Sequence, residues 1–428
     1  MELALDAFNI ARPHGTGIAT YGRSLANAAA SLGHRVQVVF GTAGGRNKDP
    51  LLTEIALAEH DGFGWAWPSW LAAAGLGVAA ARSLLGRRPW EIPITGKVIM
   101  PERLQLGGAR FHNVDRLYTG AEIAFRATGA FTRVTLPSVD VAHWTYPLPV
   151  RVPGALNVYT LHDLVPLKLP YTTADDKRAY YRLCKRIARD ADHILTVSDC
   201  SKRDIVDLLG VAPARVTNLY QSSDAAVGLA GVEEAELGRY VEGVVGVGLR
   251  EYFLFFGAIE PKKNIARLAE AYLGSGSHSP LIVVGAPGWG GERDAALLKT
   301  LAALDGGKRI RWLGYLPRPM LHRLIAGARA TLFPSLYEGF GLPVLESMEL
   351  GTPVVTSRTS SLPEVGGDAA VYVDPYCTSS IAAGIARVDQ DAGLRGELAA
   401  RGLRQAALFS PARYAGRLSA FYEGLKRG

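Results

Sequence analysis

The chain has 428 residues and a mass of 45.8 kDa, more than one hydrophobic core usually serves, so we expect two domains of roughly 200 residues each. Hydrophobic residues make up 48% and charged residues 20%, a balance that excludes a disordered chain. The formal charge of +7 is not arranged in basic runs interleaved with aromatics, so we expect an anionic small molecule or a membrane surface as partner, and no nucleic acid.

Short runs rich in β-branched residues alternate with amphipathic stretches in the first half of the chain. Residues 3–8 are expected to form the first strand, followed by a glycine loop and a helix that ends at Gly33. Further elements are predicted at the following positions: strands at 36–40, 139–144, 156–161 and 194–197, and a helix at 176–190. This alternation predicts one doubly wound α/β domain with a parallel sheet.

Residues 41–135 interrupt this series and are too long for a loop, so we expect them to carry structure of their own. The segment from Trp65 to Arg88 combines tryptophans with a following arginine cluster. Its Ala and Gly content and Pro68 argue against a membrane-spanning helix. Two interpretations stay open: an interfacial element that touches a membrane, or a buried insertion that packs on the first domain.

A second series of strands is predicted at residues 253–258, 281–284, 310–314, 330–333 and 354–357. Residues 227–250 lack a clean period and are interpreted as the linker. We therefore predict a first domain over residues 1–240, a second over 241–409, and a terminal helix over 410–428.

The most specific motif is SLYEGFGLPVLE, residues 335–346, which follows a predicted strand and leads into a helix. Glu338 lies in the loop and Glu346 in the helix, so their carboxylates can contact different parts of one ligand. Gly339 and Gly341 leave backbone N–H groups open at the helix N-terminus, where a diphosphate or a developing oxyanion binds. An acidic turn with a helix cap would explain either glutamate alone, but not the whole string.

A second motif, GAIEPKKN, covers residues 257–264, where a strand passes into a helix of the second domain. Ligands of doubly wound sheets bind outside such strand ends. Lys262 and Lys263 would supply positive charge to a departing diphosphate, and Asn264 is expected to cap the helix. Alone, the lysines would be read as a solvated turn. Beside the Glu338 motif we interpret them as phosphate ligands.

Gly15, Thr16 and Gly17 form a glycine loop that opens the first helix, so its amides can approach phosphate or substrate closely. The next glycine, Gly22, comes one turn too late for a dinucleotide-binding fingerprint, which argues against NAD. His162 ends a strand of the first domain, where a histidine is usually structural. Because it occurs together with the motifs described above, we expect His162 to contact a donor sugar or act in catalysis.

Together these motifs resemble the retaining glycosyltransferases of family 4, which have the GT-B fold of two doubly wound, Rossmann-like domains facing across a cleft. The resemblance is closest over residues 252–375 and weakest over 41–135. It implies transfer of a hexose from a nucleotide-diphosphate sugar to an acceptor hydroxyl, with retention of configuration and no obligatory metal. The string at 257–264 resembles mannosyltransferases of bacterial polysaccharide assembly, which implies GDP-mannose as donor.

Carried over by position, the resemblance implies that Glu338 contacts the hexose, Glu346 the nucleotide ribose and Lys263 the diphosphate. The other donor-binding residues it implies are those of the two glycine-containing loops: Gly15, Thr16, Gly17, Gly339, Phe340, Gly341, Leu342 and Pro343. His162 then faces the sugar and the acceptor. Many relatives have arginine where this chain has Ala258, so Lys262 is expected to take that role. The terminal helix resembles the segment that crosses back to the first domain.

Three alternatives share this shape: a nucleotide-sugar epimerase, a sugar phosphorylase, and a non-catalytic subunit that binds sugar nucleotides. A phosphorylase needs a lysine that holds pyridoxal phosphate, and no lysine here stands in a recognisable context for that. A non-catalytic subunit is expected to lack one of Glu338, Lys263 or His162, and all three are present.

The three cysteines are far apart and have no zinc-ligand spacing, so we expect no zinc site and a reducing cytoplasm. The resemblance implies that the chain needs no cofactor and no obligatory metal. Acidic residues interrupt the apolar N-terminus, which argues against a signal peptide. The expected location is the cytoplasm, and the interfacial interpretation adds peripheral attachment to the cytoplasmic face of the inner membrane. The expected acceptor is a glycan or a polyprenol-linked glycan.

Overall fold

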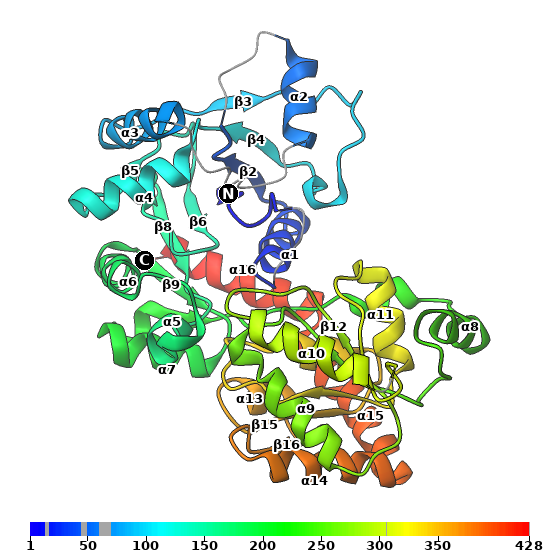
Figure 1. Ribbon diagram of the computed structural model, residues 1–428. Coiled ribbons are helices and arrows are strands. Elements are labelled where there is room, and N and C mark those ends of the chain that lie inside the picture. The colour runs from blue at the N-terminus through cyan, green and yellow to red at the C-terminus, as the bar shows by residue number, and fades with distance from the viewer. Residues whose placement is uncertain (13–16, 44–48, 60–69, 305, 428) are drawn as a thin grey trace.

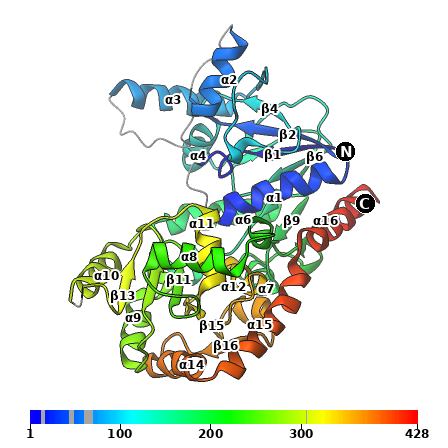
Figure 2. The same ribbon diagram turned by 90° about the vertical axis from the view of Figure 1, so that its right-hand side faces the viewer.

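The computed structural model describes residues 1–12, 17–43, 49–59, 70–304 and 306–427, and of residues 70–74, 426 and 427 the backbone alone. Figures 1 and 2 show two lobes, each with a sheet covered by helices, and the terminal helix running from the second lobe to the first. Gly15 and Thr16 of the predicted glycine loop lie outside the described residues, as do Trp65 and Trp67.

The first lobe is built on an eight-stranded sheet in the order β10-β9-β8-β6-β1-β2-β4-β3. Its strands are β1 (Glu2–Asp6), β2 (Arg35–Phe40), β3 (Trp90–Ile92), β4 (Arg110–Asn113), β6 (Val141–Trp144), β8 (Leu156–Thr160), β9 (His193–Thr196) and β10 (Val216–Asn218). All neighbours are parallel except β3 and β4. The main covering helices are α1 (Gly17–Ser31), α4 (Leu117–Thr128), α5 (Val165–Lys168), α6 (Lys177–Asp190) and α7 (Asp199–Leu209). Because both faces are covered, strands such as β2 are almost wholly buried.

Residues 41–135 do carry structure of their own. They contain α2 (Pro50–Glu59), α3 (Trp70–Leu84) and the strands β3 and β4, and β4 extends the sheet beside β2. Helix α3 packs closely on α4, where a Cβ on Gly120 would lie 2.9 Å from the Ala79 carbonyl oxygen. Arg87 is buried and donates to the Asp115 carbonyl oxygen at 2.6 Å. Arg87 therefore fits the interpretation of a buried insertion, and it does not contribute to a basic surface.

The second lobe holds a six-stranded, fully parallel sheet in the order β13-β12-β11-β14-β15-β16. Its strands are β11 (Phe253–Phe256), β12 (Leu281–Val284), β13 (Ile310–Trp312), β14 (Ala330–Phe333), β15 (Val354–Ser357) and β16 (Ala370–Val373). Its helices include α9 (Ile265–Gly274), α10 (Glu292–Leu304), α11 (Arg318–Gly327), α12 (Leu342–Glu349), α13 (Leu362–Gly366), α14 (Thr378–Gln390) and α15 (Ala392–Ala406).

Helix α8 (Glu234–Val245) occupies much of the segment interpreted as a linker. Its buried residues Val241 and Val245 pack in one cluster with Tyr252 and Leu254 of the second lobe. The domain boundary predicted after residue 240 therefore falls inside α8, a helix that packs with the second lobe.

The terminal helix α16 (Pro411–Arg427) lies against α1 of the first lobe. Tyr414, Leu418 and Tyr422 of this helix are buried. The Tyr422 hydroxyl is 2.8 Å from Nδ1 of the buried His143. The end of the chain thus helps to join the two lobes.

Candidate functional site

The two predicted motifs of the second lobe come together at the carboxyl ends of β11 and β14. The Leu336 amide donates to the Lys262 carbonyl oxygen at 2.8 Å, which ties the two loops. Gly341 is the N-cap of α12 with a φ of 119°, a region that favours glycine, and a Cβ there would lie 2.9 Å from Leu362 Cδ2. Pro343 stands in the first turn, as expected. At the N-cap of α12 the backbone therefore carries no side chain, and we call this position the bare start of α12.

A buried ion pair marks this position. Nζ of Lys263 lies 2.6 Å from Oε1 of Glu338, with side-chain exposures of 12% and 9%. The ammonium also lies 4.8 Å from the centroid of the Phe333 ring. Burial alone would raise the pKa of Glu338, but the charges of Lys263 and Lys262 outweigh it and lower that pKa. Glu338 is therefore a carboxylate at neutral pH.

Lys262 is the second cation of the site. Burial disfavours its ammonium, but the carboxylates of Glu338, Asp163 and Glu260 outweigh this effect and raise the pKa of Lys262. Asp163 belongs to the first lobe, so its charge acts across the division between lobes. The site thus has two charged lysines beside the bare start of α12.

Residues of the first lobe close over this position. A Cβ on Gly339 would lie 2.7 Å from Asp163 Oδ2 and 3.0 Å from the His162 carbonyl oxygen. A Cβ on Gly17, at the start of α1, would lie 3.3 Å from Leu342 Cδ1, at the start of α12. The structure therefore brings most of the predicted residues to one place.

The contacts of the His162 ring fix its orientation and its tautomer. Its Nε2 lies 2.9 Å from the Thr145 carbonyl oxygen, and its ring meets the Tyr21 ring edge-on at 4.7 Å between centroids. Burial lowers the pKa of His162, which favours the neutral imidazole. Because a carbonyl can only accept, Nε2 carries the hydrogen and Nδ1 is left as an acceptor. A sugar hydroxyl would then donate to His162 rather than accept from it.

Glu346 faces a different group from Glu338. Its Oε1 lies 3.4 Å from Arg318 on α11, and its side chain is 12% exposed. Burial raises the pKa of Glu346 to about 7, and Arg318 opposes that rise. Arg318 also donates to Thr20 Oγ1 of the first lobe at 3.1 Å. Sequence reasoning missed Arg318, although its place just after β13 is a ligand-binding position in such sheets.

A second set of contacts joins the lobes at α7. The Glu364 carboxylate accepts from the backbone N–H groups of Asp199 and Cys200 at the start of α7. The Ser201 hydroxyl donates to the Gly339 carbonyl oxygen at 3.2 Å, and Tyr337 bonds the Asp204 carboxylate. These contacts hold the Glu338 loop against the first lobe.

Asn264 does not act as the expected helix cap. It occupies the N-cap position of α9 with a φ of 63°, but its side chain accepts no capping hydrogen bond from the backbone N–H groups of the helix. Its Oδ1 accepts from the Arg267 guanidinium at 2.7 Å. Its Nδ2 donates instead to the carbonyl oxygens of Pro334 at 3.0 Å and Pro375 at 2.8 Å. Through these hydrogen bonds Asn264 holds the loops of the site together. Its left-handed backbone conformation, which asparagine adopts more readily than most residues, turns the chain at this position.

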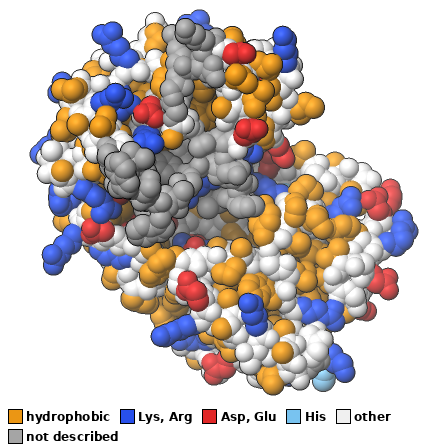
Figure 3. Space-filling model, turned by 45° about the horizontal axis from the view of Figure 1, so that its top comes forward, with side chains coloured by type: hydrophobic (Ala, Val, Ile, Leu, Met, Phe, Trp, Pro, Cys, Tyr) orange, Lys and Arg blue, Asp and Glu red, His pale blue; other side chains and the backbone are white. Residues whose placement is uncertain are grey.

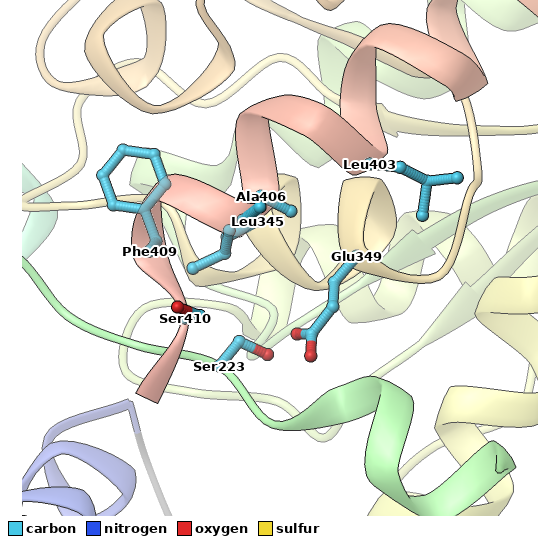
Figure 4. A pocket seen from close by; sticks show the side chains of 8 residues that line it. Ser223, Leu345, Glu349, Leu403, Ala406, Phe409 and Ser410 are labelled. Atoms are coloured by element: carbon cyan, nitrogen blue, oxygen red, sulfur yellow. The ribbon is translucent and has the colours of Figure 1, made fainter. Parts of the chain in front are cut away.

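A cavity of about 160 Å³ lies between α12, α15 and the segment before α8. Figure 4 shows Ser223 and Glu349 lining it, and it contains none of the predicted site residues. Glu349 accepts from the Ala225 and Ala226 amides at 3.2 Å each, so this carboxylate is already satisfied. We regard this cavity as separate from the candidate site.

On the face in Figure 3, basic side chains are scattered among acidic and hydrophobic ones. Within the described ranges, no group of three or more His, Cys, Asp and Glu side chains is placed to hold a metal ion. No helix in that same part of the chain has the length and apolar character needed to cross a bilayer.

Two family descriptions match the chain: glycosyl transferases group 1 over residues 248–405, and a glycosyl transferase 4-like domain over residues 16–220. The O-antigen chain mannosyltransferase B of Escherichia coli is 38% identical over 270 residues, 61% of this chain and 68% of that protein. The O-antigen chain mannosyltransferase RfbU of Salmonella typhimurium is 27% identical over 254 residues, 59% of this chain and 65% of that protein.

Solved structures share the fold over nearly the whole chain. Sucrose-phosphate synthase from Thermosynechococcus elongatus gives a TM-score of 0.67 at 17% identity, covering 100% of this chain and 99% of that one. WaaG, a glycosyltransferase involved in lipopolysaccharide biosynthesis, gives 0.61 at 15% identity, with coverages of 96% and 98%. Anabaena HepE in complex with UDP-glucose gives 0.65 at 14% identity, with coverages of 99% and 100%.

Proposed function

Because the chain belongs to the glycosyl transferases of group 1 and has the GT-B fold that its motifs resemble, we propose a retaining, metal-independent hexosyltransferase of bacterial surface polysaccharide synthesis. The observation that carries the proposal is the buried pair of Lys263 and Glu338 at the bare start of α12. An ammonium and open amides suit a diphosphate, and a carboxylate beside them suits sugar hydroxyls. The acceptor in this proposal is a glycan or a polyprenol-linked glycan.

GDP-mannose is the proposed donor. Support comes from the relatives named as O-antigen mannosyltransferases, one of which is 38% identical. A structural neighbour binds UDP-glucose, but at 14% identity it supports the fold alone. Donor choice is therefore the first thing to measure.

In the proposed reaction, Lys262, Lys263 and the backbone N–H groups of Gly341 and Leu342 hold the diphosphate as it leaves. The bond between the hexose C1 and the phosphate oxygen breaks while the acceptor oxygen bonds to C1 from the same face. The acceptor proton passes to the departing phosphate oxygen, so the α configuration is kept. Glu338 accepts hydrogen bonds from the hexose and Glu346 from the ribose. The two cations stabilise the charge that develops on the leaving group, the task a divalent ion would otherwise perform.

The test is transfer by the purified protein from GDP-mannose, GDP-fucose, UDP-glucose and UDP-galactose to a synthetic O-antigen acceptor. Proton NMR of the product gives the anomeric configuration. An α-mannoside formed in the presence of EDTA is the expected product. A β-linked product would refute the retaining mechanism, and a strict metal requirement would refute metal independence. Conversion of the sugar nucleotide without acceptor would identify the epimerase alternative instead, and binding without turnover the non-catalytic subunit.

We further propose that α3 contacts the cytoplasmic face of the membrane. The described side chains Val78 and Leu84 of α3 and Leu85, which follows the helix, are exposed, and Arg82 and Arg88 lie exposed beside them. Apolar and basic groups together suit an anionic bilayer. Co-sedimentation with phosphatidylglycerol vesicles should be lost in Leu84→Glu/Leu85→Glu and kept in Leu208→Glu, a charge added on exposed α7. Equal binding by both variants would refute the contact.

A further inference from the structure

Arg318 links three parts of the molecule. Its guanidinium donates to Thr20 Oγ1 on α1 of the first lobe at 3.1 Å. It also lies 3.4 Å from Glu346 Oε1 on α12 and 3.5 Å from Asp224 Oδ1 in the segment between the lobes. Arg23 of α1 donates to the same Thr20 hydroxyl at 3.3 Å, so two guanidinium groups meet on one oxygen across the two lobes.

The ionisation of the Glu346 carboxylate depends on Arg318. The charged groups that act on Glu346 are Arg318 from α11, Glu349 from its own helix and Asp224 from the connecting segment. Burial and the two carboxylates favour the neutral acid, while Arg318 favours the ion. Arg318 is thus the cation that opposes the neutralisation of Glu346.

We propose that Arg318 is a positioning residue for the donor nucleotide: it pairs with the Glu346 carboxylate and aims it at the ribose, and through Thr20 it couples that carboxylate to the first lobe. The inference rests on the proposed function, in which Glu346 accepts hydrogen bonds from the ribose hydroxyls. An ionised carboxylate accepts from both hydroxyls at once, whereas the protonated acid must use one oxygen as a donor. Arg318 itself need not touch the nucleotide.

The proposal fixes the sign of a pH effect. Nucleotide affinity of the wild type should fall as the pH drops through the pKa of Glu346, which is about 7. Without Arg318 that pKa rises, so the loss of affinity should begin at higher pH. An opposite charge within this distance shifts a pKa by about one to three units, which gives roughly a tenfold weaker affinity near pH 7.

The experiment measures GDP and UDP affinity by calorimetry from about pH 6 to about pH 9, a range that brackets the expected titration. Arg318→Met should bind about tenfold more weakly near pH 7 and approach the wild type at the alkaline end. Arg318→Lys should recover much of the affinity. Arg323→Met is the matched control, since Arg323 lies on the same helix and pairs with Glu236 at 3.2 Å, and it should behave as the wild type.

Two outcomes separate the inference from the proposed function. Glu346→Gln should bind weakly at every pH, and if it binds as tightly as the wild type, the ribose role of Glu346 is wrong. If Glu346→Gln binds weakly while Arg318→Met matches the wild type, or is weakened equally at every pH, the role of Arg318 is wrong. Melting temperatures of the unliganded variants show whether each one folds.

Discussion

A double-mutant cycle on Lys263 and Glu338 separates the contribution of this pair to stability from its contribution to transfer. Both side chains are nearly buried, at 12% and 9% exposure, and their charged atoms are 2.6 Å apart. Lys263→Met leaves the Glu338 carboxylate buried with Lys262 as the remaining cation. Removing one partner of a buried pair destabilises by about 3–5 kcal/mol, and Lys262 places this case at the lower end, about 3 kcal/mol.

A loss of about 3 kcal/mol lowers the melting temperature of a domain of this size by roughly 6–12 °C. Glu338→Gln should have a smaller effect, because the Lys263 ammonium keeps its contact with the Phe333 ring at 4.8 Å. The double variant removes both charges, so its melting temperature should return to within about 3 °C of the wild type.

Transfer should follow a different pattern, with kcat falling by about a hundredfold or more in both single variants and in the double variant. Differential scanning fluorimetry and the transfer assay measure the two quantities on the same samples. Strictly additive losses of stability would show that the pair is not coupled. Wild-type turnover by any of the three variants would remove the pair from the chemistry.

Three further outcomes are expected. EDTA should leave transfer largely unchanged, because in the proposed site two lysines and the start of α12 take the place of a metal ion beside the diphosphate; the rate with and without chelator checks this. Burial raises the pKa of Glu346 from 4.5 to about 7. Between these pH values the folded state binds a proton that the unfolded state does not, so the free energy of unfolding falls as the pH rises, by about 3 kcal/mol in total. Glu346→Gln should therefore melt higher than the wild type near pH 8 but not near about pH 4.5, and parallel melting curves across pH would contradict the assignment. Gly339→Ala should reduce transfer at least about tenfold, because its Cβ would lie 2.7 Å from Asp163 Oδ2 and push the lobes apart; an unchanged rate would show that this approach is not needed.

Local pattern was enough to predict most strands of the two sheets and the loops that carry the motifs, but not the strands β3, β4, β10 and β16. The strand predicted at residues 281–284 coincides with β12, and Gly341 and Pro343 stand at the start of α12 as expected. Their signal is local because buried parallel strands are continuous apolar runs and helix starts have fixed chemistry. Within the insertion, β4 reads Arg-Phe-His-Asn, so it offered neither an apolar run nor a clean alternation.

Contacts between distant segments left no trace in the sequence. Thr20 and Arg318 are 298 positions apart, and each is an ordinary helical residue in its own segment. The same holds for the contact between Glu364 of α13 and the start of α7, and for the hydrogen bond from His162 Nε2 to the Thr145 carbonyl oxygen. Asn264 misled because a polar residue before a helix predicts a cap, whereas its backbone conformation directs the side chain to neighbouring loops.

The pairing of Lys263 with Glu338 has a consequence for selectivity. Each group already satisfies the other in the unliganded protein, so a lone anion gains little by displacing the carboxylate, and a lone sugar gains little by displacing the ammonium. A molecule that carries phosphate and hydroxyls at the right separation replaces both contacts together. For the proposed donor site, this pairing therefore predicts discrimination against inorganic phosphate and free hexose without any group that repels them.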